Sequence, residues 1–192
     1  ENWLVIPTEA DPPIHTGYRK ALNSRFAPQK MFAMKEQVRE RAQALIDAFK
    51  DRGQCDFIDE FSEKFPIFIV LDLLGLPQER MTQFLKWEKE MLHSNDWQVR
   101  GNAVRCVKDY LLEEIEARRQ QPRDDYISKV LTFEVDGRLW NDDEVFGHCF
   151  NLYIGGLDTV TSLLGNIFNY LASHPDKQNA LRVDPSLIVL AV

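Results

Sequence analysis

The sequence has no excess of basic residues, and this argues against two broad classes of binding protein. Its 23 lysines and arginines are outnumbered by 30 aspartates and glutamates, so the formal net charge is −7. Nucleic acids and anionic membrane surfaces are bound mainly through basic faces that neutralise phosphate groups. We therefore expect neither a nucleic acid nor a membrane as the main partner, and any basic patch has to be local.

Cysteine is scarce and forms no pattern. The three cysteines, Cys55, Cys106 and Cys149, are widely spaced, with no CxxC pair and no metal-ligand spacing. A small odd number of scattered cysteines is typical of free thiols in a reducing compartment. We therefore predict a cytoplasmic protein with no metal ligands among these cysteines. No signal peptide, internal repeat or low-complexity tract is visible, and a chain that starts at Glu1 rather than at methionine leaves targeting open.

Single prolines and glycines divide the chain into helical patterns, so the fold is predicted to be mainly α. Hydrophobic residues make up 44% of the chain and aromatic residues 11%, which is enough apolar material for a core. Helices are expected at about 11–26, 29–51, 67–74, 78–93 and 97–121. Between 126 and 140 the pattern predicts a short helix and a small β-hairpin that turns at Asp136-Gly137.

The segment 145–175 predicts one long core helix. Asp158 is its only charged residue, and at ~1.5 Å per residue the helix would be roughly 40 Å or more long. Its many polar residues would be costly in lipid, so a membrane span is excluded. The remaining helices are too few to cover this helix on all sides. We therefore expect residues 1–192 to form a single partial domain, the interior segment of a larger one. The apolar run 186–192, which has no polar exit, would then be the start of a helix that continues.

A local conflict inside the core helix marks candidate chemistry. Gly155 and Gly156 each cost ~1 kcal/mol in a helix interior, and the nearby Asp158 carboxylate is expensive to bury. Missing Cβ atoms let another group approach the backbone, and a hydroxyl such as that of Thr159 can bond to a preceding carbonyl. These features favour a groove with an acid beside it. Close helix packing, with Asp158 paired to a buried cation, explains the same pattern equally well.

The stretch Gly155-Gly156-Leu157-Asp158-Thr159, preceded by an apolar turn, resembles the oxygen-binding motif on the long central helix of cytochromes P-450. Further segments resemble the camphor 5-monooxygenase-like bacterial class in the same order, so the likeness covers nearly the whole chain. It implies a mainly α, partial cytochrome P-450 fold with a long central helix and a small β-hairpin. The segments that resemble this class are Gly53-Gln54-Cys55-Asp56-Phe57, Phe65-Pro66-Ile67, Leu74-Gly75-Leu76-Pro77, Asp109-Tyr110-Leu111, Glu116-Ala117-Arg118-Arg119-Gln120 and Val135-Asp136-Gly137-Arg138. Val5-Ile6-Pro7-Thr8 and Asp11-Pro12-Pro13, followed by His15 and Arg19, resemble the family's stretch before and through the helix that crosses the haem edge.

This resemblance implies roles for the matching residues. His15 and Arg19, four residues apart on one helix, would bind the haem propionates, although taken alone such a pair is usually solvated. Asp158 and Thr159 would organise water and deliver protons during dioxygen activation, as general acids acting by relay. Gly155 and Gly156 would leave space for the oxygen. The haem, with its thiolate ligand, would supply the hydroxylation chemistry.

The segment that would hold the haem iron is missing from this sequence. The family's axial cysteine lies in a loop rich in phenylalanine and glycine, and no such loop surrounds any of the three cysteines. Cys149 is more simply a small core residue. The family's Glu-x-x-Arg pair would come after Val192. We therefore predict an enzyme segment that is inactive alone, and the alternative is a haem-free, non-catalytic, truncated helical fragment.

The resemblance also implies partners and a pocket. The complete enzyme would hydroxylate a small apolar, terpenoid-like substrate with dioxygen and electrons from a 2Fe–2S ferredoxin, for which Arg19, Lys20 and Arg25 could form a basic patch. Asn151 and Ile154 share a helix face with Gly155 and Thr159 and should line the substrate pocket. The Asn151 amide could equally cap a carbonyl inside the core. Lys86 is the predicted supporting cation for Asp158, and Ser94 beside His93 stands where the subgroup has an arginine.

Overall fold

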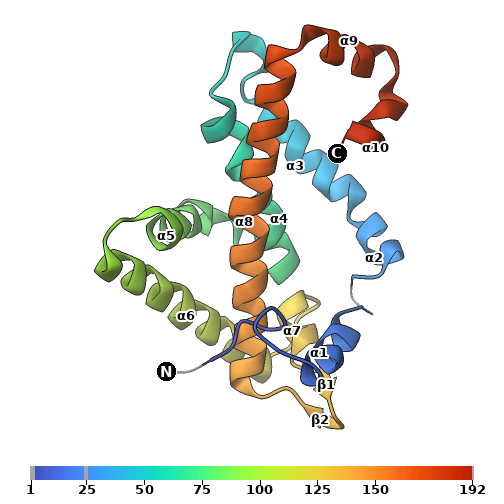
Figure 1. Ribbon diagram of the computed structural model, residues 1–192. Helices are drawn as coiled ribbons and strands as arrows, with labels where there is room; N and C mark the ends of the chain where they lie inside the picture. Colours follow the sequence, from blue (N-terminus) through green and yellow to red (C-terminus); the bar gives the residue numbers. More distant parts are fainter. Residues whose placement is uncertain (1–2, 24–25, 192) are drawn as a thin grey trace.

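In the computed structural model, which describes residues 3–23 and 26–191, helices are arranged around one long helix, α8 (Figure 1). Helix α8 spans Asp142–Ser173. It starts at Asn141, whose side chain accepts a hydrogen bond from the Glu144 N–H while the Glu144 carboxylate accepts one from the Asn141 N–H. This capping box and the acidic first turn stabilise the helix N-terminus. The predicted long helix is confirmed, and it begins three residues earlier than the apolar pattern suggested.

The other elements follow the predicted order. Short 3₁₀ turns occur at Lys50–Arg52, Gln78–Arg80 and Pro185–Leu187, and a π-helical turn at Ile58–Ser62. The helices are α1 (Ile14–Asn23), α2 (Pro28–Ala33), α3 (Lys35–Asp47), α4 (Lys64–Leu74), α5 (Met81–His93), α6 (Trp97–Gln120), α7 (Tyr126–Val130), α9 (Pro175–Val183) and α10 (Ile188–Ala191). The strands are β1 (Glu134–Val135) and β2 (Arg138–Leu139).

Two predicted helices differ from the observed ones. The segment predicted as one helix from 29 to 51 is divided at Met34, whose N–H bonds to the Met31 carbonyl at 3.1 Å in a tighter turn. The first helix starts only at Ile14, after the two prolines. The predicted hairpin is confirmed, because Asp136 and Gly137 have φ values of 51° and 78°, as a two-residue type I′ turn requires.

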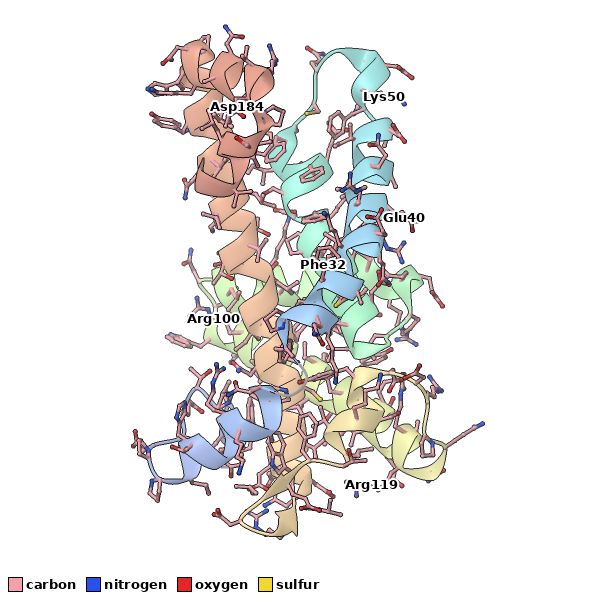
Figure 2. The ribbon with its side chains drawn as sticks, turned by 90° about the vertical axis from the view of Figure 1, so that its right-hand side faces the viewer. Phe32, Glu40, Lys50, Arg100, Arg119 and Asp184 are labelled. Atoms are coloured by element: carbon pink, nitrogen blue, oxygen red, sulfur yellow. The ribbon has the colours of Figure 1, made fainter. Side chains whose placement is uncertain are left out.

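The surrounding helices cover α8 unevenly. Helices α5 and α6 lie on one side of it, α4 crosses it, and α2 and α3 lie on the other side (Figure 1). Turned by 90°, the molecule shows α2, which carries Phe32, and α3, which carries Glu40, extending along the same side, with α3 beside α4 (Figure 2). Residues 144–150 of α8 are all buried, whereas Leu163, Phe168 and Tyr170 are about half exposed. The second half of α8 therefore has an uncovered apolar face, as expected for a helix with too few neighbours.

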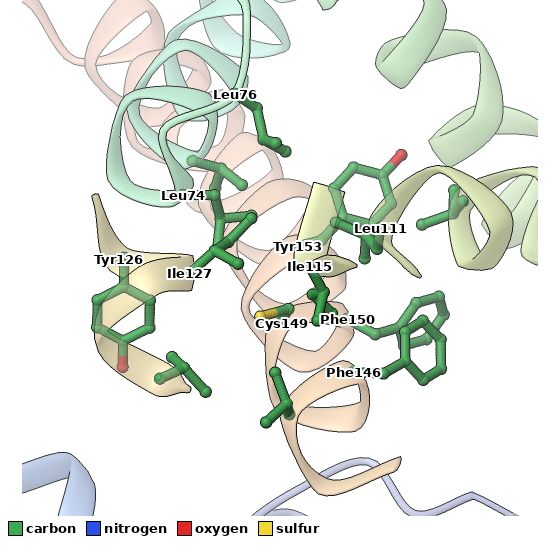
Figure 3. Close-up of a cluster of buried hydrophobic side chains, with 14 of the residues drawn as sticks. Leu74, Leu76, Leu111, Ile115, Tyr126, Ile127, Phe146, Cys149, Phe150 and Tyr153 are labelled. Carbon is green, nitrogen blue, oxygen red and sulfur yellow. The ribbon is translucent and has the colours of Figure 1, made fainter. Parts of the chain in front are cut away.

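The hydrophobic core surrounds the first half of α8. Figure 3 shows Cys149 among Ile127, Ile115 and Phe150, and burial raises the pKa of its thiol to about 12. Its complete burial in the hydrophobic cluster confirms Cys149 as a core residue. The buried Tyr153 hydroxyl donates to the Phe84 carbonyl at 2.7 Å, which joins α8 to α5. In the described part of the chain, no helix is both long and apolar enough to cross a lipid bilayer.

Candidate functional site

The centre of the candidate site is the turn of α8 from Gly155 to Thr159. The Thr159 hydroxyl donates a hydrogen bond to the Gly155 carbonyl at 2.8 Å, one turn earlier on the same helix. Both residues are exposed, although they follow a buried stretch of the helix. This bond uses the hydroxyl proton but leaves the oxygen lone pairs able to accept a proton or a water hydrogen. The turn therefore presents a polar hydroxyl on an open face.

The two glycines of this turn have different surroundings. A Cβ atom added to Gly156 would lie 2.6 Å from a methyl group of Val70 on α4, whereas one added to Gly155 would meet nothing within 4 Å. Gly156 therefore permits the close packing of α4 on α8, which is the packing explanation considered from the sequence. Gly155 instead keeps the open face of the helix flat. The packing explanation therefore holds for Gly156, whereas the space beside Gly155 is open.

The face of α8 that carries Gly155 continues toward the N-terminal segment of the chain. Asn151, one turn before Gly155, is half-buried, and its side-chain oxygen accepts a hydrogen bond from the Thr8 hydroxyl at 3.1 Å. Ile154 is partly buried against the core. The Asn151 amide therefore has a partner within the chain, but its oxygen accepts from an exposed hydroxyl, and this bond is not the predicted capping of a carbonyl inside the core. Asn151 and Ile154 lie at the edge of the open face.

Helix α1 follows the N-terminal segment and is attached to the start of α8. Its buried Tyr18 hydroxyl donates to a Glu144 carboxylate oxygen at 2.6 Å. His15 is half-buried and Arg19 is exposed on the same helix. Within residues 3–23 and 26–191, neither side chain has an acidic partner within ion-pair distance. These two potential donors are therefore available for an anionic group, and α1 lies at the end of α8 from which the open face extends.

These observations agree with the expected fit of a haem group. A flat face without a Cβ at Gly155, a hydroxyl at Thr159 and the basic side chains of His15 and Arg19 on α1 suit a planar, apolar ring with carboxylate substituents. A thiolate ligand does not come from the described cysteines at this face, because Cys149 is in the core and the exposed Cys55 and Cys106 lie on other segments.

Asp158 is paired with His93 and not with the predicted Lys86. The His93 Nε2 atom, at the end of α5, lies 3.2 Å from an Asp158 carboxylate oxygen. Lys86 instead pairs with Glu90 of its own helix, with 3.6 Å between the ammonium and the carboxylate, and its side chain is 69% exposed. The two α5 positions are seven residues apart, which is about two turns or ~10 Å along the helix axis. Only the later one is level with Asp158.

A second carboxylate, that of Glu88, also lies next to the His93 ring. Glu88 Oε1 lies 3.7 Å from His93 Nε2, and the Glu88 side chain is only 8% exposed. Burial raises the pKa of Glu88. The nearby His93 acts to lower this pKa, and the Asp158 carboxylate acts to raise it. Together with Leu157 and Thr161, the three side chains line a small cavity of about 40 Å³. The sequence did not indicate Glu88, because a glutamate on an amphipathic helix resembles any solvated one. The sequence pattern indicates His93 only as the neighbour of Ser94.

Comparison with known proteins agrees with this geometry. The cytochrome P450 family model matches residues 70–186. The probable cytochrome P450 127A1 of Sinorhizobium fredii is 35% identical over 192 residues, covering 100% of this chain and 46% of the relative. The 6-deoxyerythronolide B hydroxylase of Saccharopolyspora erythraea is 33% identical over 187 residues, covering 95% of this chain and 46% of the relative. The chain thus spans about half the length of the curated relatives that it matches.

Solved structures give the same result. The crystal structure of the myxobacterial cytochrome P450 CYP267B1 in complex with myristic acid is similar with a TM-score of 0.85 and 32% sequence identity, covering 95% of this chain and 46% of that chain. The CYP101J2 crystal structure is similar with a TM-score of 0.84 and 33% identity, over 95% of this chain and 45% of that one. The matched family model and the shared fold show that this chain belongs to the cytochrome P450 family.

Proposed function

We propose that this chain is the dioxygen-handling part of a haem-thiolate monooxygenase that hydroxylates a small apolar, terpenoid-like substrate. The observation that carries the proposal is the open face of α8, where Gly155 lacks a Cβ and the Thr159 hydroxyl bonds to the Gly155 carbonyl. Asp158 lies one residue before that hydroxyl and reaches an exposed imidazole. A hydroxyl next to an acid with access to solvent is an arrangement suited to moving protons toward an open face.

The bound haem would supply dioxygen activation and insertion of one oxygen atom into a C–H bond, and its cysteine ligand would come from sequence outside this chain. The residues of this chain would bind and orient the group and handle protons. Arg19 and His15 would donate hydrogen bonds to its carboxylates, as charge-assisted bonds. Asp158 would accept a proton at its carboxylate and pass it through water to the Thr159 hydroxyl oxygen. Ile154 would contribute an apolar wall beside Gly155.

The substrate class and the electron donor are parts of the same proposal. The partly buried Ile154 and the lack of any charged residue except Asp158 in segment 145–175 support an apolar substrate. The exposed Arg19 and Lys20 on α1 support docking of an acidic 2Fe–2S ferredoxin, whereas Arg25 lies outside the described residues. A cytoplasmic location and membership of the camphor 5-monooxygenase-like bacterial class complete the proposal.

Replacing Thr159 by Ala in the complete protein tests this function. The variant should bind substrate nearly as well as the wild type but divert electrons from product to peroxide, because the hydroxyl and not the pocket is removed. Thr159→Ser should restore coupling, and Ser162→Ala, an exposed position on the same helix, should leave it unchanged. Unchanged coupling in Thr159→Ala would remove the hydroxyl from the mechanism. A complete protein without a thiolate-type carbon monoxide difference band would favour the haem-free alternative.

A further inference from the structure

The side chains around Asp158 form a gradient of exposure from solvent to the protein interior. His93 is 57% exposed, Asp158 is 40% exposed and Glu88 is 8% exposed. All three offer a nitrogen or oxygen atom, and these atoms lie within 4.8 Å of one another. The Nε2 atom of His93 lies 3.7 Å from Glu88 and 3.2 Å from Asp158, so the most exposed group of the cluster contacts both carboxylates.

In the described part of the chain, the two lysines of α5 near this cluster are already paired. The Lys89 ammonium, on the same helix, lies 2.7 Å from a Glu63 carboxylate oxygen at the edge of the cavity. Lys86 pairs with Glu90. Among the described residues, the cationic group within ion-pair distance of Asp158 is therefore an imidazole and not an ammonium or a guanidinium.

This difference in chemical type changes what the partner of Asp158 can do. Lysine and arginine stay protonated at neutral pH, so they hold a carboxylate but do not give it a proton. An imidazole gains and loses a proton between about pH 5 and pH 8. A protonated ring can therefore pair with Asp158, transfer a proton to it and take up another from solvent.

We propose that His93 is the proton-uptake residue for Asp158, and that the buried Glu88 carboxyl stabilises the protonated ring between transfers. This inference rests on the proposed function and names how the same site obtains its protons. His93 acts through Asp158 and is a relay residue, since it does not touch the open face that carries Thr159. The proton leaves Nε2 of His93 for the Asp158 carboxylate oxygen 3.2 Å away, and the exposed ring then regains a proton from water.

Glu88 keeps the relay charged when Asp158 is neutral. After the transfer Asp158 carries no charge, and the remaining negative charge close to the ring is that of Glu88, 3.7 Å from Nε2. An opposite charge within ~4–6 Å favours the charged form of a titrating group, so an ionised Glu88 promotes reprotonation of the ring. Burial raises the pKa of Glu88 and His93 opposes that shift, which couples the protonation of the two groups.

Substitutions at His93 separate proton exchange from simple charge pairing. In the complete haem protein, the wild-type ratio of product to electrons consumed should fall as pH rises from about 6 to about 8, where imidazole loses its proton. His93→Gln should lower the rate of the proton-dependent step about tenfold at the lower pH, less than the ~10²–10⁴-fold effect of a direct proton donor, because water can replace part of the path. His93→Arg should keep Asp158 paired but show a flat pH profile.

Lys86→Gln is the matched control, since it removes a cation from the same helix that pairs with Glu90 instead. It should keep the wild-type pH profile. An infrared measurement without turnover adds an independent readout. The carboxylic-acid band that is lost in Glu88→Gln should grow in His93→Gln at neutral pH, because removal of the imidazolium lets the pKa of Glu88 rise.

The outcomes distinguish this inference from the proposed function. Without a thiolate-type carbon monoxide band, or without uncoupling in Thr159→Ala, the proposed function fails and the relay fails with it. With both present, a wild-type pH profile in His93→Gln and His93→Arg overturns the relay alone. An equal change in Lys86→Gln would also overturn it, because the effect would then come from surface charge. If His93→Gln does not fold, the pH profile of His93→Arg, compared with that of Lys86→Gln, still decides.

Discussion

Replacing three glycines of α8 by alanine, one at a time, should separate the roles that the structure assigns to them. A Cβ at position 147 would lie 1.9 Å from the Leu4 carbonyl oxygen, one at position 156 would lie 2.6 Å from a Val70 methyl group, and one at position 155 would lie in open space. All three positions are inside the same helix. Alanine therefore has the same intrinsic advantage over glycine at each of them, about 1 kcal/mol.

The neighbours decide the net effect on stability. Gly155→Ala should raise the free energy of unfolding by up to about 1 kcal/mol, because the helix gains and nothing is displaced. Gly147→Ala should lower it by up to about 2 kcal/mol, because overpacking against the Leu4 backbone costs about 1–3 kcal/mol and the helix gain offsets about 1 kcal/mol of this cost. The free energy of unfolding of Gly156→Ala should lie between those of the other two variants, since the Val70 methyl group is the end of a side chain that can adjust. Gly155→Ala and Gly147→Ala share the same helix gain, so their free energies of unfolding should differ by the overpacking cost of about 1–3 kcal/mol.

Thermal unfolding followed by circular dichroism measures this order. For a domain of about this size each kcal/mol moves the Tm by roughly 2–4 °C, so the Tm values of Gly155→Ala and Gly147→Ala should differ by roughly 2–12 °C. If Gly147→Ala unfolds at or above the Tm of Gly155→Ala, the close contact between α8 and the Leu4 backbone is wrong, and with it the placement of the segment that leads to α1.

Two further substitutions test the buried polar network by urea unfolding. Arg118→Met should cost about 3–5 kcal/mol, because the fully buried guanidinium bonds to Asp125 at 2.8 Å and to the Gly75 carbonyl at 2.7 Å, and removing it leaves a buried carboxylate unpaired; a loss below 1 kcal/mol would contradict this. Tyr18→Phe should cost only about 1–2 kcal/mol, because Glu144 keeps both of its bonds to Arg138; a larger loss would mean that Tyr18 is needed to hold α1.

The sequence predicts most of the helices because their apolar residues recur at helical spacing over long segments. The long helix α8, the buried helix α4 and the hairpin turn at Asp136-Gly137 depend on such local patterns. The break at Met34 could not be predicted, because good helix-forming residues continue across it and only local backbone geometry divides α2 from α3. Likewise, the contact of Gly156 with Val70 depends on how α4 crosses α8.

The partner of Asp158 is a feature of the site that the sequence likewise could not predict. The family resemblance indicated the correct helix, α5, and a basic residue on it. Lys86 and His93 are separated by about two turns, so they lie near the same face of α5, and sequence spacing does not show which turn is level with Asp158. The crossing of α5 over α8 decides in favour of His93. Glu88 was missed because its burial comes from that same crossing.

His148 should make the stability of the protein depend on pH. Its ring is 1% exposed, with Nδ1 3.2 Å from the Ile6 carbonyl oxygen and Nε2 3.0 Å from the Tyr126 hydroxyl. Burial lowers its pKa from 6.5 to about 4, against the effect of the Ile6 bond. Between these values the unfolded chain binds more protons than the folded one, so stability is lost as pH falls from about 6.5 to about 4.

The expected loss is about 2 kcal/mol between about pH 7.5 and about pH 5, as obtained from the two pKa values by linkage. Burial acts to raise the pKa of Glu144, but its bonds to Arg138, Tyr18 and Asn141 hold this pKa near 2. Protonation of Glu144 therefore reduces the stability further only when the pH falls below its ordinary pKa of 4.5. His148→Asn is the control, because its amide can still donate to the Ile6 carbonyl but does not titrate. Urea unfolding at both pH values should show a loss that is about 2 kcal/mol smaller in the variant. An equal loss in both proteins would show that His148 is not held neutral in the core.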